Sequence, residues 1–549
     1  MKASDLMVKC LETENIEYIF GVPGEENADF MMSLECSEKI QFILTRHEQG
    51  AAFMAEIYGR LTGTPAACLG TLGPGATNLI TGVADANMDR APMLVLTGQG
   101  STARLHKESH QIMDVVKMFE PVTKWATTIF HPDTIPEIIR KSVRIARGEK
   151  PGAVLIELPE DVAERNSNEQ PITPIRYRRA IADNEMLKAA AEKIYNTKRP
   201  LILAGNGCVR KRTAEHLRSL ADNTGIGVMN TFMAKGAIDH EKEYCLYTIG
   251  LGSKDLGTYA IDAADLIIAI GFDMVEYHPQ LWNPNGDKEI IHIDFTPAEI
   301  DKHYHPKIEV IGDIAHSLKY LVNNFSEKPT TYDFSQQKAI RDSISKDLYR
   351  YKDDISLGVI KPQKVLADVQ TIYGDGGLLL SDVGAHKMWI ARHYHCKTPN
   401  GCLIPNGFCS MGFALPGAIA ASLVNPKRKI IGIAGDAGFL MNVQEMETAT
   451  RLNSNITMMV WEDNAYGLIA WKQWAHFGKH TELSFGNPKW DLLAEAFSWH
   501  YQTTNDSTEL STIIQTAADY QGPSLIVIPI DYSENKKLTE QLGKLTCSI

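Results

Sequence analysis

The sequence predicts an α/β protein of three consecutive domains, each with a central, mostly parallel sheet flanked by helices. First, helix-like and strand-like segments alternate along the whole chain, a pattern typical of parallel sheets covered on both faces. Second, the 549 residues exceed the size at which a single hydrophobic core stops growing. Third, two apolar runs in the last third of the chain each end at an aspartate, as expected for neighbouring strands of one parallel sheet.

The first predicted domain covers residues 1–180. Strand-like segments alternate with helix-like ones, and the strands are predicted at residues 18–22, 41–45, 66–70, 93–97 and 153–158. A polar stretch at residues 160–178 lacks periodicity, and we expect it to be a linker that ends this domain.

The same alternation predicts a second domain at residues 181–340 and a third at residues 341–549. Strands are predicted at residues 200–204, 226–229, 266–270 and 289–293 in the second domain, and at residues 378–380, 429–434, 456–461 and 524–529 in the third. Charged, aperiodic sequence at residues 326–354 is expected to connect the two domains.

Composition and charge indicate a protein that acts on small molecules. The chain has 44% apolar and 22% charged residues, which is ordinary for a soluble protein. Its formal charge of −12 argues against nucleic acids and anionic membranes as partners, because those need a basic surface. No apolar run is long enough to span a membrane and no signal peptide is recognisable, so we expect a cytoplasmic location.

The nine cysteines are odd in number and include no Cys-x-x-Cys pair, which favours free thiols in a reducing compartment. One group of metal-ligand residue types clusters in the sequence, at His393, His395, Cys396, Cys402 and Cys409. Their spacings match no common zinc pattern, so ordinary packing is the favoured interpretation.

Asp436 and Asp463 form the most informative pair of residues. They lie 463 − 436 = 27 residues apart, a spacing that fits a strand, a crossover helix and a second strand. Such a crossover brings both acids to one edge of the sheet. Two oxygen ligands beside a glycine-bearing turn suit a Mg²⁺ ion that keeps open positions for phosphate oxygens. The sequence therefore predicts a site for a diphosphate.

Other candidate residues are ambiguous when they are taken one at a time. Glu48 stands where a strand leads into a helix, and a carboxylate there could simply stabilise the helix dipole. The glycine-rich loop at residues 70–78 could let the backbone approach a ligand or could only form a sharp turn. His386 could be a structural histidine, and Met411 a core residue.

A turn at residues 205–210 mimics a dinucleotide-binding fingerprint. Gly205 and Gly207 follow a predicted strand, as the first two glycines of that fingerprint do, but the third glycine is missing. A nicotinamide or flavin oxidoreductase therefore stays open as a weak alternative.

A family becomes recognisable when the motifs are taken together. Arg-His-Glu-Gln-Gly-Ala at residues 46–51, Gly-Thr-Leu-Gly-Pro-Gly-Ala-Thr-Asn at residues 70–78 and the two-aspartate unit occur in one order. With them the chain resembles thiamine-diphosphate-dependent acetolactate synthases over nearly its whole length. Residues 270–283 and 110–114 are similar to the catabolic, FAD-independent branch. The resemblance implies a pyrimidine-binding first domain, a Rossmann-like central domain of the nucleotide-binding type, and a third domain that binds diphosphate and Mg²⁺.

The resemblance also implies which residues form the site. The implied catalytic residues are Glu48, Gln111, Met411 and Lys472. The implied metal ligands are Asp436, Asp463 and the carbonyl of Ala465. The implied contacts to thiamine diphosphate are Gly24, Glu48, Gly73, Pro74, Asn78, Gly384, His386, Met411, Gly435, Asp436, Ala437, Gly438, Asp463, Tyr466, Gly467 and Leu468.

These residues suit a reaction that needs an electron sink, which proteins lack and thiamine diphosphate supplies. Glu48 would favour the cofactor tautomer that removes the thiazolium proton, Met411 would keep the cofactor bent, and Gln111 would contact the 2-keto acid. The implied reaction decarboxylates one pyruvate and joins the acetaldehyde-level enamine to a second pyruvate, which gives 2-acetolactate and CO₂. FAD is not expected. Family membership further implies a homodimer or homotetramer whose sites lie at the subunit interface.

Three departures from the family pattern bear on cofactor and substrate. Ala437 stands where glycine is usual, Lys472 where glutamine or tryptophan is usual, and residues 407–411 replace a more polar stretch. The acceptor stays open between pyruvate, 2-ketobutyrate and an aldehyde, as does the choice between the branched-chain amino acid and acetoin pathways and the presence of a regulatory subunit. Another thiamine-dependent carboligase or decarboxylase is the main alternative, and a non-catalytic protein that kept the fold is a further one.

Overall fold

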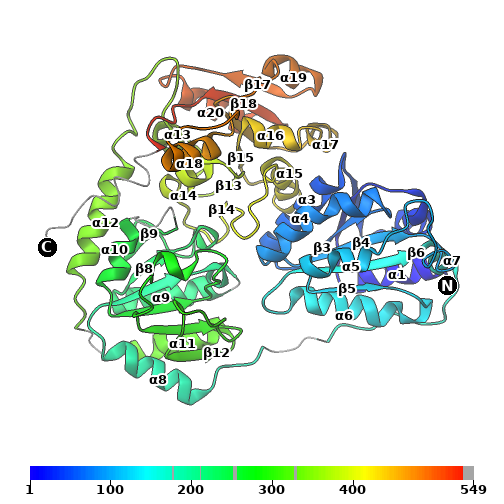
Figure 1. Ribbon diagram of the computed structural model, residues 1–549, viewed down its shortest axis with the longest axis horizontal. Coiled ribbons are helices and arrows are strands. Elements are labelled where there is room, and N and C mark those ends of the chain that lie inside the picture. Colours follow the sequence, from blue (N-terminus) through cyan, green and yellow to red (C-terminus); the bar gives the residue numbers. More distant parts are fainter. Residues whose placement is uncertain (176–178, 211, 251–255, 327–330, 536–549) are drawn as a thin grey trace.

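The structure is a computed structural model that describes residues 1–175, 179–210, 212–250, 256–326 and 331–535. Three six-stranded sheets with helices packed on them follow one another along the chain (Figure 1). The predicted fold class is therefore confirmed. Within the described ranges, no helix is both long enough and apolar enough to cross a bilayer.

The N-terminal sheet is parallel throughout, with its strands in the order β2-β1-β3-β4-β6-β5. Its central strands are unbroken apolar runs because helices cover both faces. The strands are β1 (Tyr18–Gly21), β2 (Gln41–Leu44), β3 (Ala66–Gly70), β4 (Met93–Gln99), β5 (Trp125–Thr128) and β6 (Ala153–Pro159). The helices are α1 (Ala3–Thr13), α2 (Ala28–Glu35), α3 (Glu48–Thr62), α4 (Pro74–Met88), α5 (Val115–Phe119), α6 (Ile135–Arg147) and α7 (Glu160–Glu164).

The middle sheet has the order β12-β11-β10-β7-β8-β9. When β7 is counted as strand 1, this order reads 3-2-1-4-5-6 from the β9 end, which is the order found in dinucleotide-binding folds. The strands are β7 (Pro200–Ala204), β8 (Gly227–Asn230), β9 (Cys245–Thr248), β10 (Leu266–Ile270), β11 (Ile290–Asp294) and β12 (Ile308–Ile311). The helices are α8 (Asn184–Tyr195), α9 (Thr213–Thr224), α10 (Leu256–Ala263), α11 (Ile314–Phe325) and α12 (Ser335–Leu348).

The C-terminal sheet, with the order β14-β13-β15-β16-β18-β17, repeats the strand order of the N-terminal sheet when each is counted from its first strand. The strands are β13 (Leu378–Ser381), β14 (Cys402–Leu403), β15 (Ile430–Gly435), β16 (Thr457–Glu462), β17 (His500–Thr503) and β18 (Ser524–Pro529). The helices are α13 (Pro362–Tyr373), α14 (Ala385–His393), α15 (Ala414–Val424), α16 (Asp436–Met441), α17 (Glu445–Arg451), α18 (Gly467–Phe477), α19 (Trp490–Ala496) and α20 (Leu510–Asp519).

The N-terminal and C-terminal domains share one hydrophobic core, whereas the middle domain has its own. Helices α3 and α15 lie side by side between the two sheets (Figure 1). Both helices are rich in buried alanine, which lets their backbones approach closely, and Phe53 meets Phe413 edge to face with ring centroids 5.7 Å apart. This shared core sets the position of one sheet edge relative to the other.

One sequence prediction of irregular structure was wrong, and a second was wrong only at its start. The predicted connector at residues 326–354 contains helix α12, whose buried Ile340, Ile344 and Leu348 recur every fourth residue in an otherwise polar segment. The predicted linker at residues 160–178 begins with helix α7, and its residues 176–178 lie outside the described ranges. The strands that sequence patterning missed all lie at or beside a sheet edge, namely β5, β9, β12, β14 and β17.

Candidate active site

The two predicted metal acids end neighbouring strands of the C-terminal sheet. Strands β15 and β16 pair in parallel with Gly435 opposite Trp461, so Asp436 and Asp463 emerge at the same edge. Asp436 is buried, and its Oδ2 atom accepts hydrogen bonds from Asn464 N at 2.7 Å and from Asp463 N at 3.3 Å. The spacing argument from the sequence therefore describes the structure correctly.

The electrostatics of this pair fit a divalent cation. Burial, and then the charge of Asp436, raise the pKa of Asp463 to about 7, because two desolvated carboxylates repel each other. Ala465 continues the turn and forms an isolated bridge with Ser484. A carboxylate pair next to an exposed backbone turn provides the hard oxygen ligands that Mg²⁺ prefers. The residues present thus fit the metal that the family resemblance implies.

Asn487 is a site residue that the sequence did not reveal. Its Nδ2 group donates to Asp436 Oδ2 at 2.8 Å, to Glu462 Oε1 at 3.0 Å and to Asn464 Oδ1 at 3.1 Å. It lies 51 residues after Asp436 in the chain, in a loop with no motif of its own, so no local signal pointed to it.

His386 lies against two of the predicted diphosphate residues, since a Cβ on Gly384 would lie 2.7 Å from its Cε1 atom and a Cβ on Gly435 would lie 3.4 Å from its Nδ1 atom. It follows β13, the neighbour of β15, at the point where strand order reverses and ligands commonly bind. The ring is buried, meets Trp461 edge to face, and its Nε2 atom has no hydrogen-bond partner among the described residues. Burial lowers the pKa of His386 to about 3. A neutral imidazole with one unused nitrogen remains available to a ligand.

The loop that carries Met411 is held by Asp382, an acid that the sequence did not assign to the site. Asp382 accepts from Gly412 N and from Ala414 N, each at 2.9 Å. Burial raises its pKa to about 6. Gly438 packs against this carboxylate, since a Cβ there would lie 2.8 Å from Asp382 Oδ1. The available signal was an aspartate two residues after a predicted strand.

The remaining predicted residues of the C-terminal domain fall into two groups. Gly384, Gly435 and Ala437 lie at the sheet edge, and Ala437 is in the first turn of α16, a conformation that its side chain tolerates. Tyr466, Gly467, Leu468 and Lys472 belong to α18 or its start, a helix without a single buried residue.

Glu48 begins α3 at the edge of the N-terminal sheet. It is 8% exposed, and its Oε2 atom accepts from Asn78 Nδ2 at 2.9 Å. Gly73 and Pro74 begin α4 beside it. Gln111 packs against Gly73, because a Cβ on that glycine would lie 3.0 Å from the Gln111 Cβ. Gly24, after β1, packs in the same way against Thr71.

The two halves of the predicted site are not joined directly within one chain. Among the described residues, no hydrogen bond or ion pair links Glu48 or Asn78 to Asp436 or Asp463. The nearest polar connection is Glu445 of α17, which accepts from the backbone amides just before Glu48.

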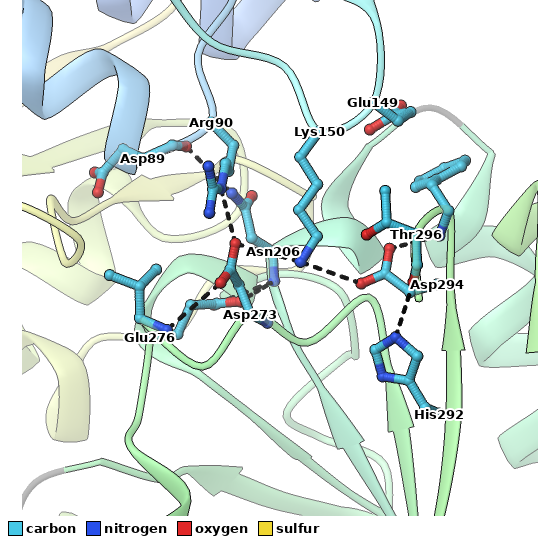
Figure 2. Close-up of polar contacts among 12 residues, drawn as sticks. Asp89, Arg90, Glu149, Lys150, Asn206, Asp273, Glu276, His292, Asp294 and Thr296 are labelled. Carbon is cyan, nitrogen blue, oxygen red and sulfur yellow. Dashed lines mark hydrogen bonds and ion pairs between the residues drawn. The ribbon is translucent and has the colours of Figure 1, made fainter. Parts of the chain in front are cut away.

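The glycine turn of the middle domain is filled by the protein itself (Figure 2). Asn206 N, which would face a phosphate in a dinucleotide site, donates to Glu276 Oε1 at 2.9 Å. Lys150 lies 3.4 Å from Asp273 Oδ2 and 3.6 Å from Asp294 Oδ2, so an ion-pair network crosses the cleft to the N-terminal domain. A cavity of about 1230 Å³ remains outside this network, between the two domains, and contains none of the predicted site residues.

The histidine and cysteine cluster consists of closely packed side chains. His395 stacks on His240 with ring centroids 4.9 Å apart. Cys396 and Cys402 are buried free thiols. In the part of the chain that the structure describes, the one acid, histidine or cysteine group with metal-like geometry consists of Glu56, Asp85 and Asp89.

Comparison with known proteins agrees with this architecture. Residues 1–118 match the thiamine pyrophosphate enzyme N-terminal TPP binding domain, residues 187–321 the central domain, and residues 382–528 the C-terminal TPP binding domain. The chain is 31% identical to the acetolactate synthase of Bacillus subtilis (strain 168), with 99% of this chain and 96% of the relative aligned. It is 33% identical to the catabolic acetolactate synthase of Raoultella terrigena, with 98% and 97% aligned, and 33% identical to a probable acetolactate synthase large subunit of Methanococcus aeolicus, with 100% and 95% aligned. The chain therefore belongs to the acetolactate synthase family of thiamine pyrophosphate enzymes.

Proposed function

We propose that this protein is an acetolactate synthase, which joins two molecules of pyruvate into 2-acetolactate with loss of CO₂. The observation that carries the proposal is the pair of Asp436, which is buried, and Asp463, which is partly buried, at one sheet edge, combined with Glu48 at the edge of a sheet of the same strand order. One edge offers oxygen ligands for a metal and diphosphate, and the other offers a carboxylate for a ring nitrogen.

Thiamine diphosphate, when bound, supplies the electron sink that decarboxylation of a 2-keto acid requires. Asp436, Asp463 and the Ala465 carbonyl would hold Mg²⁺ against the diphosphate. His386 would donate to the diphosphate from Nε2, which has no other described partner. Met411 would support the ring system of the cofactor.

The hydrogen bond of Glu48 supports its proposed role. Asn78 occupies Oε2 and so fixes the orientation of the carboxylate. Oε1, for which the described residues provide no donor, would then accept a hydrogen bond from the pyrimidine ring and hold its proton. Gln111, which lies beside the Gly73 turn, would donate to the keto acid.

We infer that the active unit is at least a homodimer, with a homotetramer as the larger assembly. Helix α18 exposes Ile469 at 44%, Trp474 at 48% and Phe477 at 67%, and an apolar surface of this kind needs a cover. A second copy would also bring a Glu48 to each pair of metal acids. Light scattering after size exclusion that shows a fully active monomer contradicts this inference.

We propose that the middle domain binds no flavin. Support comes from Glu276, which already satisfies the turn amide, and from the Lys150 network across the cleft. Flavin absorbance near one chromophore per chain in the purified protein would contradict the proposal.

The test of the reaction is product identification. Incubation of the purified protein with pyruvate, thiamine diphosphate and Mg²⁺ should give 2-acetolactate and CO₂ in equal amounts. Acetaldehyde as the main product would favour a decarboxylase. Product formed only after 2-ketobutyrate or an aldehyde is added would favour another carboligase, and no turnover of any 2-keto acid would favour a non-catalytic protein.

A further inference from the structure

Three buried acids of the N-terminal domain lie against the loop that leads to Met411, residues 405–411. Glu56 lies on α3, Asp85 on α4, and Asp89 directly after α4. These residues are 0%, 0% and 1% exposed, and one carboxylate oxygen of each lies within 4.8 Å of the others. None of them belongs to the site that family membership implies, so the cluster needs an explanation of its own.

The cluster contains more acids than bases. Arg60 Nη1 lies 2.9 Å from Asp89 Oδ2 and 3.7 Å from Glu56 Oε1. Burial raises the pKa of Asp89, although the charges of Arg60 and Lys387 oppose this shift. Burial and the neighbouring carboxylates raise the pKa of Glu56, so this acid keeps its proton. Neither Glu56 oxygen meets an N–H or hydroxyl donor among the described residues. A protonated Glu56 has a carboxylate oxygen of Asp85 within 4.8 Å to which it can donate.

The other two acids hold the backbone of the loop. Asp89 Oδ1 accepts from Gly407 N at 2.6 Å, and Asp85 Oδ1 accepts from Ser410 N at 3.1 Å. A Cβ on Gly407 would lie 2.8 Å from Asp89 Oδ1, so only glycine allows this approach. With Asn406 N, which donates to Asp89 at 3.3 Å, the loop is held at three backbone amides before Met411.

The start of the loop is also tied to the middle domain. Asn406 Nδ2 donates to the Glu276 carbonyl at 2.7 Å, and Asn206 Nδ2 donates to the Asp89 carbonyl at 3.2 Å. Figure 2 shows Asp89 and Asn206 facing each other at this junction. The Asp382 carboxylate holds the far end of the loop. The loop therefore stands at the meeting point of all three domains, with buried carboxylates on both sides.

We propose that Asp85 and Asp89 are positioning residues that set the place of Met411 beneath the thiamine ring, and that Glu56 orients Asp85 by donating its proton to it. This inference rests on the proposed role of Met411 in the site. The acids contact the loop only through its backbone amides, so they fix where the loop lies whatever its side chains are. The side chains of residues 408–410, which depart from the family pattern, can then vary without displacing Met411.

The closing experiment measures the affinity of the full-length apoprotein for thiamine diphosphate at saturating Mg²⁺, by tryptophan fluorescence, together with its melting temperature. Asp85→Ala should weaken the affinity by about tenfold, as loss of a supporting partner commonly does. Met411→Ala should weaken it as well. Adding Asp85→Ala to Met411→Ala should produce no further loss, because Asp85 acts through Met411.

Glu14→Gln provides the matched control. Glu14 is a buried acid of the same domain, paired with Arg140 at 3.0 Å, and it makes no hydrogen bond or ion pair with residues 405–411 among the described residues. This variant should lower the melting temperature and leave the affinity unchanged. An Asp85→Ala protein that behaves like Glu14→Gln, less stable but with normal affinity, overturns the positioning role. The positioning role is also overturned if Asp85→Ala weakens the affinity for thiamine diphosphate by the same factor in the parent protein and in the Met411→Ala protein.

Two substitutions at Glu56 cover the case in which Asp85→Ala does not fold. Glu56→Gln keeps a donor toward Asp85, so its affinity for thiamine diphosphate should stay within about threefold of the parent value. Glu56→Leu has no donor there, so its affinity should be weaker by about tenfold. Equal affinity in the two variants contradicts the inference. Unaltered protein that binds no thiamine diphosphate contradicts the proposed function itself, so the two failures are distinguishable.

Discussion

The N-terminal and C-terminal sheets have the same strand order but carry different chemistry at their edges. Glu48 begins the helix after β2, and Met411 lies just before the helix after β14, the corresponding strand of the other sheet. The two helices, α3 and α15, pack against each other. Strand order thus determines where loops gather, and the residues in those loops determine what each edge can bind.

The two edges also differ in the number and environment of their acidic side chains. At the N-terminal edge Glu48 meets the neutral amide of Asn78, which leaves one oxygen for a ligand. At the C-terminal edge Asp382, Asp436 and Asp463 follow three adjacent strands, and burial raises the pKa of two of them. The first edge suits a single hydrogen bond to a ring, and the second suits a cation with its phosphate ligands.

Removing the charge of Glu48 should have the largest effect. Glu48→Gln keeps the shape of the side chain but cannot hold the pyrimidine proton, so turnover of pyruvate should fall by about a thousandfold, within the range for lost acid–base catalysis. Steady-state CO₂ release at saturating cofactor measures it.

Glu17→Gln is the matched control for Glu48→Gln. Glu17 is a carboxylate of the same domain that accepts from the Tyr58 hydroxyl at 2.7 Å, away from the sheet edge. The Glu17→Gln protein should turn over pyruvate at the same rate as the parent protein. If the Glu48→Gln protein turned over pyruvate as fast as the parent protein, Glu48 would have no catalytic role, and the proposed functional difference between the two edges would be wrong.

Glu445, which connects the two domains beside Glu48, should make stability depend on pH. Burial raises the pKa of Glu445 from 4.5 to about 7. The protonated side chain therefore contributes its full stabilisation of the folded protein below pH 4.5, and this stabilisation is lost as the pH rises toward 7. The shift corresponds to roughly 3 kcal/mol. The melting temperature should therefore fall more between pH 5 and pH 8 for the parent than for Glu445→Gln. Parallel melting curves for the two proteins would contradict the assignment.

Asp463→Asn tests the C-terminal edge. The amide keeps the size of the side chain but removes one anionic ligand, so Mg²⁺-dependent binding of thiamine diphosphate should weaken by about ten- to a hundredfold. Isothermal calorimetry with and without Mg²⁺ measures the change. Asp519→Asn, an exposed acid of the same domain paired with Lys429, should bind like the parent. Unchanged Mg²⁺ dependence in Asp463→Asn would exclude Asp463 as a ligand.

The sequence predicted central features of the fold better than peripheral ones. Central strands such as β15 and β16 were recognisable because burial on both faces makes them continuous apolar runs, and the acids at their ends followed from that. Edge strands such as β14 have one neighbour and too few residues for a pattern. Asn487 and Asp85 were not recognisable as site or support residues, because tertiary packing alone brings them to the residues they contact.

Lys472→Gln should have the smallest effect and bears on the acceptor. Lys472 is exposed on α18 within one chain, so it reaches a site only if a second copy covers this helix. A charged ammonium near the acceptor favours an anionic keto acid, and exposed charge contributes little, so the preference for pyruvate over an aldehyde should fall by only about two- to fivefold. Competition assays with both acceptors measure the ratio. Lys479→Gln, which removes another exposed lysine just beyond α18, should leave it unchanged. If Lys472→Gln and Lys479→Gln showed the same preference for pyruvate over an aldehyde, Lys472 would lie outside the acceptor site. The C-terminal edge would then bind only the metal and the diphosphate.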